Sequence, residues 1–311
     1  MTELLTRGQG GVAVGVGRTA LLVAAARAVE THRPDALARD PLAEHFVRAA
    51  AAADRADPAD WPVRPGQVPG GDADPLWGRL GRYFGLRTRA LDDHLLRSAR
   101  ELGVRQVVLL GAGLDTRAYR LDWPAGCVVH ELDTEPVLAF KQQVLDGTGA
   151  RPAAERRTVA ADLRGDWAAA LAATGFDPAL PTAWLAEGLL LYLPAEAERR
   201  LVARLDGLSA PGSTLAYEVK EVDAESPAIR SSPVYAAARE RLGIDLVALF
   251  ATGSRPDSAA ELAARGWTVT VRSPYEFTAL RGRGPLPEPD DALAANRWVF
   301  AERPGAVGPA A

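Results

Sequence analysis

The sequence predicts an α/β fold built on a doubly wound, mainly parallel sheet. From about residue 103 onward, short apolar runs alternate with helix-like segments, a rhythm typical of parallel strands joined by crossover helices. The runs are nearly all apolar instead of alternating with polar residues, as expected for strands covered on both faces. A helix-patterned region precedes this rhythm, so we expect a helical cover in front of the sheet.

Seven apolar runs are the expected strands: residues 106–110, 127–132, 157–160, 183–187, 214–219, 268–271 and 297–301. Four segments between them have helical patterning: residues 135–146, 166–174, 195–209 and 257–265. Residues 221–256 interrupt the rhythm and contain a further helix-like segment, "SPVYAAARERLGIDLVALF". We therefore expect this insertion to cover the mouth of a site.

The first hundred residues predict a helical cover. Residues 19–53 read as helix broken at Pro34 and Pro41, because proline removes a backbone donor and clashes with the preceding turn. The proline- and glycine-rich stretch 57–75 predicts a loop, and a second helix over 78–102 ends before Gly103. We therefore predict a single domain over residues 1–311. Within it, residues 13–102 form the helical cover and residues 103–303 form the sheet-based core. The insertion 221–256 belongs to the core and forms part of a lid over the acceptor.

Composition excludes several classes of protein. The 311 residues carry a formal net charge of −4, so neither nucleic acid nor an anionic membrane is an expected partner. One cysteine and four histidines, without HxxxH or HExxH spacing, predict neither a disulfide nor a metal site. No apolar run is long enough for a membrane span, and the first residues do not resemble a signal peptide. We expect a soluble cytoplasmic protein whose partner is a small molecule.

A glycine turn follows the first expected strand, in "VVLLGAGLDTRAYRL" at residues 107–121. Gly111 and Gly113 lie where ligands of open α/β sheets bind, although a tight strand-to-helix connection without a ligand explains them equally well. The dinucleotide pattern GxGxxG has Thr116 at its third glycine position. Asp115 is the expected N-cap, and its carboxylate would repel a pyrophosphate. The turn therefore predicts a cofactor that is not a phosphate ester.

Acidic residues end three of the following strands. Asp133 can accept hydrogen bonds from the two hydroxyls of a ribose, and a helix N-cap is its alternative role. Asp162 can accept from an adenine amino group, or it forms a turn. Glu187 lies near a ligand's reactive end, or it belongs to a structural ion pair. Ribose-binding and amine-binding groups without a phosphate cradle match S-adenosylmethionine, which is a cation without phosphate.

The same residues carry a resemblance to a known family. The segments "LLGAGLDTRAYRL", "HELDTEPVLAFKQQVL", "ADLRGDW" and "AEGLLLYLP", in this order, resemble the leucine carboxyl methyltransferase family. They are closest to its bacterial branch of S-adenosylmethionine-dependent O-methyltransferases, which includes polyketide carboxyl methyltransferases. The resemblance covers roughly residues 15 to 303 and is more specific than a glycine pair. It implies a class I, Rossmann-like methyltransferase sheet of seven strands with an N-terminal helical cover.

The resemblance also implies roles around the methionine part of the cofactor. Arg87 in "GLRTRALDDHLL" matches the arginine that pairs with its carboxylate, and Arg89 is the alternative in a shifted register. Gly111 and Gly113 match the turn beneath the methionine part. Glu187 matches a glutamate near its amino group.

For the adenosyl part, the resemblance assigns three residues. Asp133 matches the ribose ligand, while Asp162 and Leu163 match the adenine ligands.

The expected reaction is methyl transfer to an oxygen of a small, polyketide-like secondary metabolite. A carboxylate acceptor is ionised at pH 7 and needs no base, whereas a phenol, with a pKa of about 10, does. No catalytic residue is assigned, and Glu187 and Tyr192 are the candidates. The expected acceptor pocket lies between the N-terminal helices and the insertion, which offers four apolar or aromatic side chains that alternatively pack the cover: Tyr235, Leu242, Leu246 and Phe250.

Three other functions remain as alternatives. One is a methyltransferase acting on a protein C-terminus, which the motifs do not separate from an enzyme with a small acceptor. Another is an NAD-dependent oxidoreductase, which Asp115 and Thr116 disfavour. The last is a non-catalytic protein that binds an adenosyl ligand. The sequence does not predict the acceptor's identity or the oligomeric state.

Overall fold

A computed structural model describes residues 17–54, 60–221, 226–288 and 291–305. The predictions for residues 13–16, 57–59 and 222–225, and for the tail after residue 305, lie outside the described residues. No helix in the described ranges is both long and apolar enough to cross a membrane.

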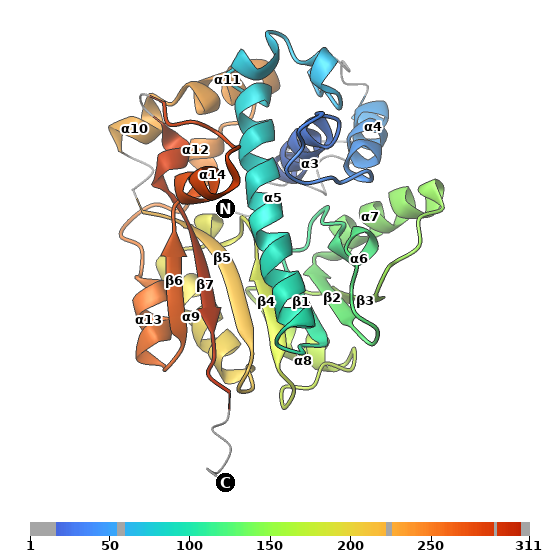
Figure 1. Cartoon of the computed structure of the whole chain (residues 1–311), viewed down its shortest axis with the longest axis vertical. Coiled ribbons are helices and arrows are strands. Elements are labelled where there is room, and N and C mark those ends of the chain that lie inside the picture. The colour runs from blue at the N-terminus through green and yellow to red at the C-terminus, as the bar shows by residue number, and fades with distance from the viewer. Residues whose placement is uncertain (1–16, 55–59, 222–225, 289–290, 306–311) are drawn as a thin grey trace.

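Seven strands form one sheet, as predicted, in the order β3-β2-β1-β4-β5-β7-β6 (Figure 1). Neighbouring strands are parallel except where β7 pairs with β5 and β6. The order changes direction between β1 and β4, and such a switch point is where open α/β sheets bind ligands. The strands, each within two residues of its predicted bounds, are β1 (Gln106–Leu110), β2 (Val128–Asp133), β3 (Glu155–Ala160), β4 (Thr182–Ala186), β5 (Thr214–Lys220), β6 (Thr268–Arg272) and β7 (Asn296–Glu302).

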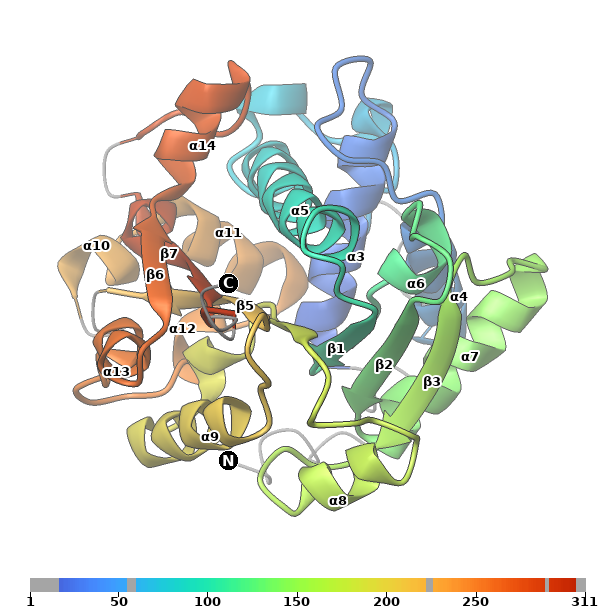
Figure 2. The ribbon, with the colours of Figure 1, turned by 60° about the horizontal axis from the view of Figure 1, so that its bottom comes forward.

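The apolar runs form strands because helices bury both faces of the sheet. In β1, Val107 and Leu109 pack on the second half of α5 (Trp77–Arg100), whereas Val108 and Leu110 pack on helices of the opposite face. Figure 2 shows α5 on one side of β1 and helices α8 and α9 on the other. The helices of that opposite face are α8 (Trp167–Ala172), α9 (Ala195–Gly207) and α13 (Ser258–Ala264). The predicted double winding is therefore confirmed.

All four predicted crossover helices are present. Besides α8, α9 and α13, they include α7 (Glu135–Thr148), which packs beside β3. The helix expected after Asp115 is α6 (Arg117–Arg120), a single turn, whereas α14 (Pro274–Arg281) was not predicted. Helix α14 begins at a capping box, in which Ser273 accepts from the backbone of Glu276 and the Glu276 side chain accepts from the backbone of Ser273. The spacing "SPYE" carries that signal in the sequence.

The N-terminal cover gathers at the carboxyl ends of the parallel strands, where Figure 1 shows α3, α4 and α11 beside the first half of α5. Helix α3 (Arg18–Thr31) ends before Pro34 and α4 (Ala43–Asp54) begins after Pro41, so the predicted break is confirmed. The insertion contributes α10 (Pro227–Arg230), α11 (Pro233–Leu242) and α12 (Leu246–Leu249). Single 3-10 turns are η1 (Pro65–Gln67), η2 (Gly71–Ala73), η3 (Leu190–Tyr192) and η4 (Ala292–Ala295).

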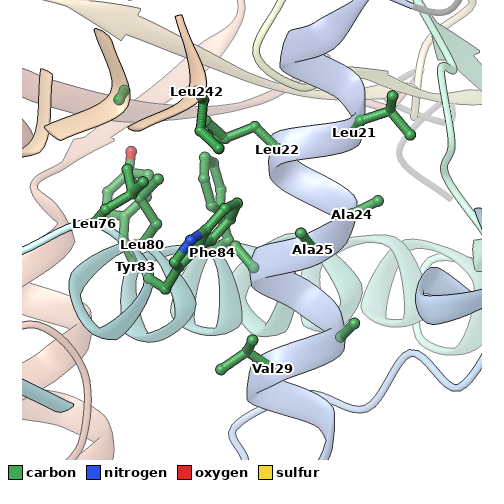
Figure 3. Close-up of a cluster of buried hydrophobic side chains, with 14 of the residues drawn as sticks. Leu21, Leu22, Ala24, Ala25, Val29, Leu76, Leu80, Tyr83, Phe84 and Leu242 are labelled. Carbon is green, nitrogen blue, oxygen red and sulfur yellow. The ribbon is translucent and has the colours of Figure 1, made fainter. Parts of the chain in front are cut away.

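Helices α3 and α5 hold the cover on the sheet through a shared apolar cluster. Figure 3 shows Leu22 and Ala25 of α3 facing Leu80 and Phe84 of α5, with Leu242 of α11 above them. Farther along, α5 changes partner and packs on the sheet. Because one continuous helix takes part in both layers, the cover has a fixed position over the strand ends.

Candidate functional site

The carboxyl ends of the parallel strands open into a cavity of about 420 Å³. This volume is within the range of sites for small molecules, which are mostly apolar with a few placed polar groups. The structure brings every predicted cofactor residue and Tyr192 to its wall. These residues are Arg87, Gly111, Gly113, Asp133, Asp162, Leu163 and Glu187, besides Tyr192. Arg89, the alternative to Arg87, is exposed and pairs with Asp93, so the shifted register is wrong.

Two sides of the cavity differ in composition. We call the first the strand-end side, which consists of Arg87, Gly111, Gly113, Asp133 and Glu187. The second, the aromatic side, consists of Tyr192, Lys220, Tyr235 and Phe250. The strand-end side comes from the edge of the sheet and from α5. The aromatic side comes from η3, β5 and the insertion.

The glycine turn, which contains Gly111 and Gly113, is the backbone part of the strand-end side. Gly111 and Gly113 have φ angles of 61° and 43°, in the left-handed region that favours glycine. A Cβ on Gly111 would lie 3.4 Å from Leu189 Cδ1. The backbone N–H of Gly113 donates to Asp133 Oδ2 at 2.7 Å, so the turn and the end of β2 are bonded to each other. Backbone and carboxylate thereby form one surface facing the cavity.

Asp133 keeps hydrogen-bonding capacity for a ligand. Its Oδ1 accepts from the backbone N–H of Thr134 at 2.7 Å and its Oδ2 from Gly113, which leaves further lone pairs on both oxygens. Burial raises the pKa of Asp133, although the two backbone hydrogen bonds oppose the shift. Thr134, and not Asp133, is the N-cap of α7, so the capping alternative for Asp133 is wrong.

Asp115 does not have the predicted role of N-cap. Thr116 precedes α6, and the Asp115 carboxylate accepts from the backbone N–H of Arg117 at 2.7 Å and pairs with the Arg117 guanidinium. The predicted helix at this point is a single turn. A one-turn helix has too few aligned donors to cradle a pyrophosphate, which agrees with the exclusion of a dinucleotide.

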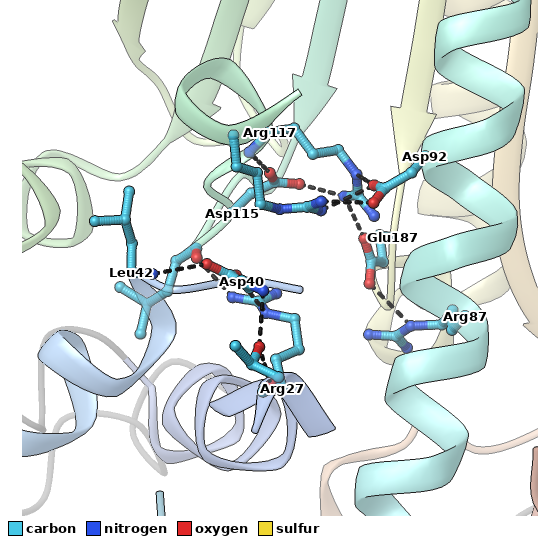
Figure 4. A network of polar contacts seen from close by, with 11 residues as sticks. Arg27, Asp40, Leu42, Arg87, Asp92, Asp115, Arg117 and Glu187 are labelled. Carbon is cyan, nitrogen blue, oxygen red and sulfur yellow. Dashed lines mark hydrogen bonds and ion pairs between the residues drawn. The ribbon is translucent and has the colours of Figure 1, made fainter. Parts of the chain in front are cut away.

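Glu187 lies between two arginines, as Figure 4 shows. Its Oε1 accepts from Arg87 Nε at 2.9 Å, and its Oε2 accepts from Arg117 Nη1 at 2.6 Å. Burial raises the pKa of Glu187, but Arg117 and Arg87 outweigh it and hold the pKa well below its usual range. Glu187 is therefore a fixed negative charge in the cavity wall.

Arg87 is positioned by two carboxylates. Its Nη1 donates to Glu218 Oε2 at 2.6 Å, in addition to the Nε bond to Glu187. The second terminal nitrogen, Nη2, has no hydrogen bond to any residue in the described ranges. A guanidinium carries five N–H donors, so this nitrogen is available to an anionic group in the cavity.

Asp162 lies at the rim, with its side chain 45% exposed. Its Oδ1 accepts from the backbone N–H and from Nε of Arg164, each at 2.9 Å. The Arg164 hydrogen bond lowers the pKa of Asp162. Leu163 beside it is partly buried against the helices of the sheet. The adenine roles of both residues stay predictions.

The insertion builds much of the aromatic side. The Tyr192 ring stacks on Phe250 at a centroid distance of 5.9 Å, and Tyr235 meets Phe250 edge-on at 5.7 Å. Leu246 also lines the cavity. Leu242 instead packs beside Leu22 in the cover (Figure 3). This is the alternative role that the sequence allowed for Leu242.

Glu218 and Lys220 reach the cavity from β5 and were not predicted. Their signal in the sequence is "TLAYEVK", in which two charged residues stand two apart and so share one strand face. Arg117, which pairs with Asp115 and Glu187, was also missed. All three are buried, and an arginine or glutamate is rarely buried without a partner.

Metal binding and base catalysis by histidine each require particular side chains in the cavity wall. The described residues hold no cluster of three or more metal-ligating side chains. None of the histidines appears among the described residues that line the cavity. His130, inside β2, contacts Thr174 at 3.0 Å, and burial lowers its pKa to about 4.

Comparison with known proteins identifies the family. The family model of leucine carboxyl methyltransferases matches residues 20–206. The chain belongs to the leucine carboxyl methyltransferase family. A Streptomyces coelicolor relative named "Putative S-adenosyl-L-methionine-dependent methyltransferase" is 62% identical over 94% of this chain and 95% of its own length. A relative of the same name from Saccharopolyspora erythraea is 46% identical, covering 93% and 96%.

A solved structure agrees with the fold. The crystal structure of a DUF574 family protein from Streptomyces avermitilis aligns with a TM-score of 0.51 and 19% identity, over 90% of this chain and 97% of that one. The predicted class of S-adenosylmethionine-dependent methyltransferase is thus confirmed at the level of the family. The finer branch, the polyketide carboxyl methyltransferases, stays a prediction.

Proposed function

We propose that this protein is an S-adenosylmethionine-dependent O-methyltransferase acting on a small molecule with an apolar or aromatic body. One observation carries the proposal: a single cavity joins the glycine turn and the strand-end carboxylates to an aromatic wall. We expect the cofactor on the strand-end side and the acceptor on the aromatic side. A polyketide-like acceptor, a role in secondary metabolism and a cytoplasmic location belong to this proposal as predictions from sequence.

The residues of the strand-end side fit the proposed cofactor. Asp133 would hold the ribose with its remaining lone pairs, and Asp162 and Leu163 would hold the adenine at the rim. The free Nη2 of Arg87 suits the methionine carboxylate, while ionised Glu187 suits the amino group. Gly111 and Gly113 leave room for the methionine part. When bound, S-adenosylmethionine supplies an electrophilic methyl group on a cationic sulfur.

The chain's own contribution is to bind, orient and exclude water. Holding two reactants in one apolar cavity removes much of the entropic barrier to their reaction. Burial raises the pKa of Tyr192 to about 12, so its phenol is protonated at neutral pH and can donate to an acceptor but not act as a base. Because histidine is missing from the described cavity wall, an acceptor that is already ionised suits the site best. We therefore favour a carboxylate over a neutral hydroxyl.

The predicted division of the chain also enters this proposal. We infer that α11 and α12 of the insertion, which carry Tyr235 and Leu246, act as part of the acceptor lid. The cover helices α3 and α5 contribute further wall residues, Leu22 and Tyr83 among them. The acceptor would then lie between cover and insertion, over the strand ends.

Thermal unfolding with candidate cofactors tests the first half of the proposal. A ligand that binds only the native state raises the apparent stability, by about 2.7 kcal/mol at a hundred times its Kd. We expect S-adenosylmethionine and S-adenosylhomocysteine to raise the unfolding temperature and NAD to leave it unchanged. A shift with NAD alone would contradict the proposal and favour an oxidoreductase.

Methyl transfer from a labelled donor tests the second half. Small aromatic and aliphatic carboxylic acids form one panel, matching phenols and alcohols a second, and peptides with free C-termini a third. We expect label on small carboxylic acids. Label on the peptides alone would favour the alternative of a protein C-terminal carboxyl methyltransferase.

A further inference from the structure

Lys220 is a buried cation on the aromatic side that the proposed function has not used. It ends β5 and lines the cavity while being only 6% exposed. The sequence has two lysines among 36 basic residues, and both are buried. The other, Lys141, forms an ion pair with Glu131 at 2.9 Å. Lys220 forms no ion pair with any of the described residues, so the two buried lysines differ in how their charge is balanced.

The hydrogen bonds of Lys220 leave one donor unused. Its Nζ donates to the backbone carbonyl of Ala292 at 2.8 Å and to Asn296 Oδ1 at 2.6 Å. Both acceptors are neutral. An ammonium group has three N–H donors, and the third has no acceptor among the described residues. A ligand in the cavity can take this donor.

The nearest carboxylate on the strand is already engaged elsewhere. Glu218, two residues before Lys220, accepts from Arg87 Nη1 at 2.6 Å, from Tyr83 and from Asn296. Asn296 thus lies between the two, accepting from Lys220 and donating to Glu218. The polar network fixes the position of the Lys220 ammonium but does not neutralise it by direct contact.

Aromatic rings border the same ammonium. The Lys220 Nζ lies 5.8 Å from the centroid of Tyr235 and 5.6 Å from that of Phe250. Ring faces attract a cation, yet they do so far less strongly than a carboxylate in a desolvated site. The rings also give an apolar ligand a surface to pack on, directly beside the charge.

The electrostatics agree with this geometry. Burial lowers the pKa of Lys220 to about 8, although Glu218 and Asp291 raise it, so the amine remains mainly protonated at pH 7. A buried charge without a counter-ion is unfavourable, and an anionic ligand would relieve this penalty.

We propose that Lys220 selects the acceptor by pairing with its carboxylate, while Tyr235 and Phe250 pack on its apolar body. This inference rests on the proposed function and narrows its acceptor class to organic acids that carry an aromatic or apolar group next to the carboxylate. Lys220 is thereby a specificity-determining residue. It is not required to hold the cofactor, because it belongs to the other side of the cavity.

Acid and amide pairs test the inference on the full-length protein. The probes are benzoate, 2-naphthoate and 4-phenylbutyrate, each compared with its carboxamide by calorimetry in the presence of S-adenosylhomocysteine. We expect the wild-type protein to bind at least one acid about tenfold or more tightly than its amide, as a charge-assisted hydrogen bond allows. Lys220→Met should abolish that preference and leave amide binding unchanged.

Two matched variants separate the role of this charge from general effects. Arg200→Met removes a positive charge from the exposed face of α9, where the side chain is 69% exposed, and should keep the preference for the acid. Lys220→Gln retains donors for Ala292 and Asn296 and should also lose the preference, which covers the case that Lys220→Met does not fold. Circular dichroism checks the fold of each variant.

The possible failures are distinguishable. Equal binding of acid and amide by the wild-type protein, or a preference that survives in both Lys220 variants, overturns the inference. Stabilisation by S-adenosylmethionine in wild type and Lys220→Met alike shows that the cofactor part of the proposed function holds regardless. Loss of that stabilisation in the wild type would instead contradict the proposed function itself.

Discussion

The strand-end side and the aromatic side of the cavity differ in how charge is balanced. On the strand-end side, Glu187 pairs with Arg87 and Arg117, and Arg87 pairs again with Glu218. On the aromatic side, the two acceptors that Lys220 contacts among the described residues are neutral, and ring faces border its ammonium group. The charges of Glu187 and Arg87 on the first side are therefore paired within the protein before a ligand binds. The second holds a charge that no carboxylate among the described residues pairs with directly.

This difference corresponds to two kinds of recognition. A site that always binds the same cofactor benefits from groups held in place by backbone and ion pairs, since preorganisation lowers the cost of binding. A site for an acceptor needs a group that distinguishes one class of molecule from another. Unpaired charge gives such discrimination, because a neutral ligand leaves it unsatisfied.

The largest expected effect comes from breaking the ion pairs of the strand-end side. Glu187→Gln leaves Arg87 and Arg117 without their shared carboxylate, and removing one partner of a buried pair costs about 3 kcal/mol or more. We expect the free energy of unfolding, measured in urea, to fall by about that amount. Stabilisation by S-adenosylmethionine should be lost as well.

A control and a pH series sharpen this prediction. Glu196→Gln removes a carboxylate that is 67% exposed, and its stability should stay within about 0.5 kcal/mol of wild type. Because folding depresses the pKa of Glu187, its contribution is complete above the unfolded value of 4.5 and falls as the pH drops below it. The deficit of Glu187→Gln relative to wild type should therefore shrink in acid. A constant deficit down to pH 3 would contradict the assigned ion pairs.

Asp133→Ala should weaken the cofactor and spare the fold. Without the carboxylate, the ribose hydroxyls would lose their hydrogen bonds to this residue. Each charge-assisted hydrogen bond is worth about 1.5 to 3 kcal/mol, which corresponds to an increase of about ten- to a hundredfold in the Kd of the cofactor. Calorimetric titration with S-adenosylhomocysteine measures the change. Asp122→Ala, in which the replaced side chain is 95% exposed, serves as the control. Unchanged affinity in Asp133→Ala would refute the ribose role.

Gly111→Ala tests whether the turn requires glycine. A side chain at φ 61° costs about 1 to 2 kcal/mol, and the new Cβ would lie 3.4 Å from Leu189. We expect lower stability and weaker stabilisation by the cofactor. Gly147→Ala, in the last turn of α7 with open space around it, should instead be neutral or slightly stabilising in the same thermal measurement. Equal effects at both positions would contradict the special geometry of the turn.

Tyr192→Phe should have the smallest effect. The stack on Phe250 is kept and only a neutral hydroxyl is lost, worth about 0.5 to 1.5 kcal/mol, or about two- to tenfold in the acceptor's KM. Steady-state kinetics on an acceptor from the labelled screen would measure KM and kcat separately. A fall of a hundredfold or more in kcat would instead make Tyr192 a catalytic residue.

The strands and their acidic ends were predictable because local patterns encode them. Each apolar run became a strand, and Asp133, Asp162 and Glu187 met at one cavity because parallel strands share a carboxyl edge. The helix expected after the glycine turn is present as α6, although it is a single turn. Arg117 and Arg120 of α6 both form ion pairs with Asp92 of α5.

Glu218, Arg117 and Lys220 could not be placed from sequence in the same way. Their importance depends on partners far along the chain: Arg87 lies 131 residues from Glu218, and Asn296 lies 76 residues from Lys220. For Leu242, the sequence allowed either a place in the acceptor pocket or a place in the packing of the cover. The structure shows that it packs in the cover.

The sequence by itself determined the class of fold, the edge of the sheet that carries the site, and the residue types around the expected cofactor. These follow from local periodicity and from the rule that parallel strands end together. Only the tertiary structure decided which charges are paired. Pairing depends on atoms within about 3 Å, contributed by segments that the sequence separates by about 70 to 130 residues. For that reason the paired Glu187 and the unpaired Lys220 can be distinguished only in three dimensions.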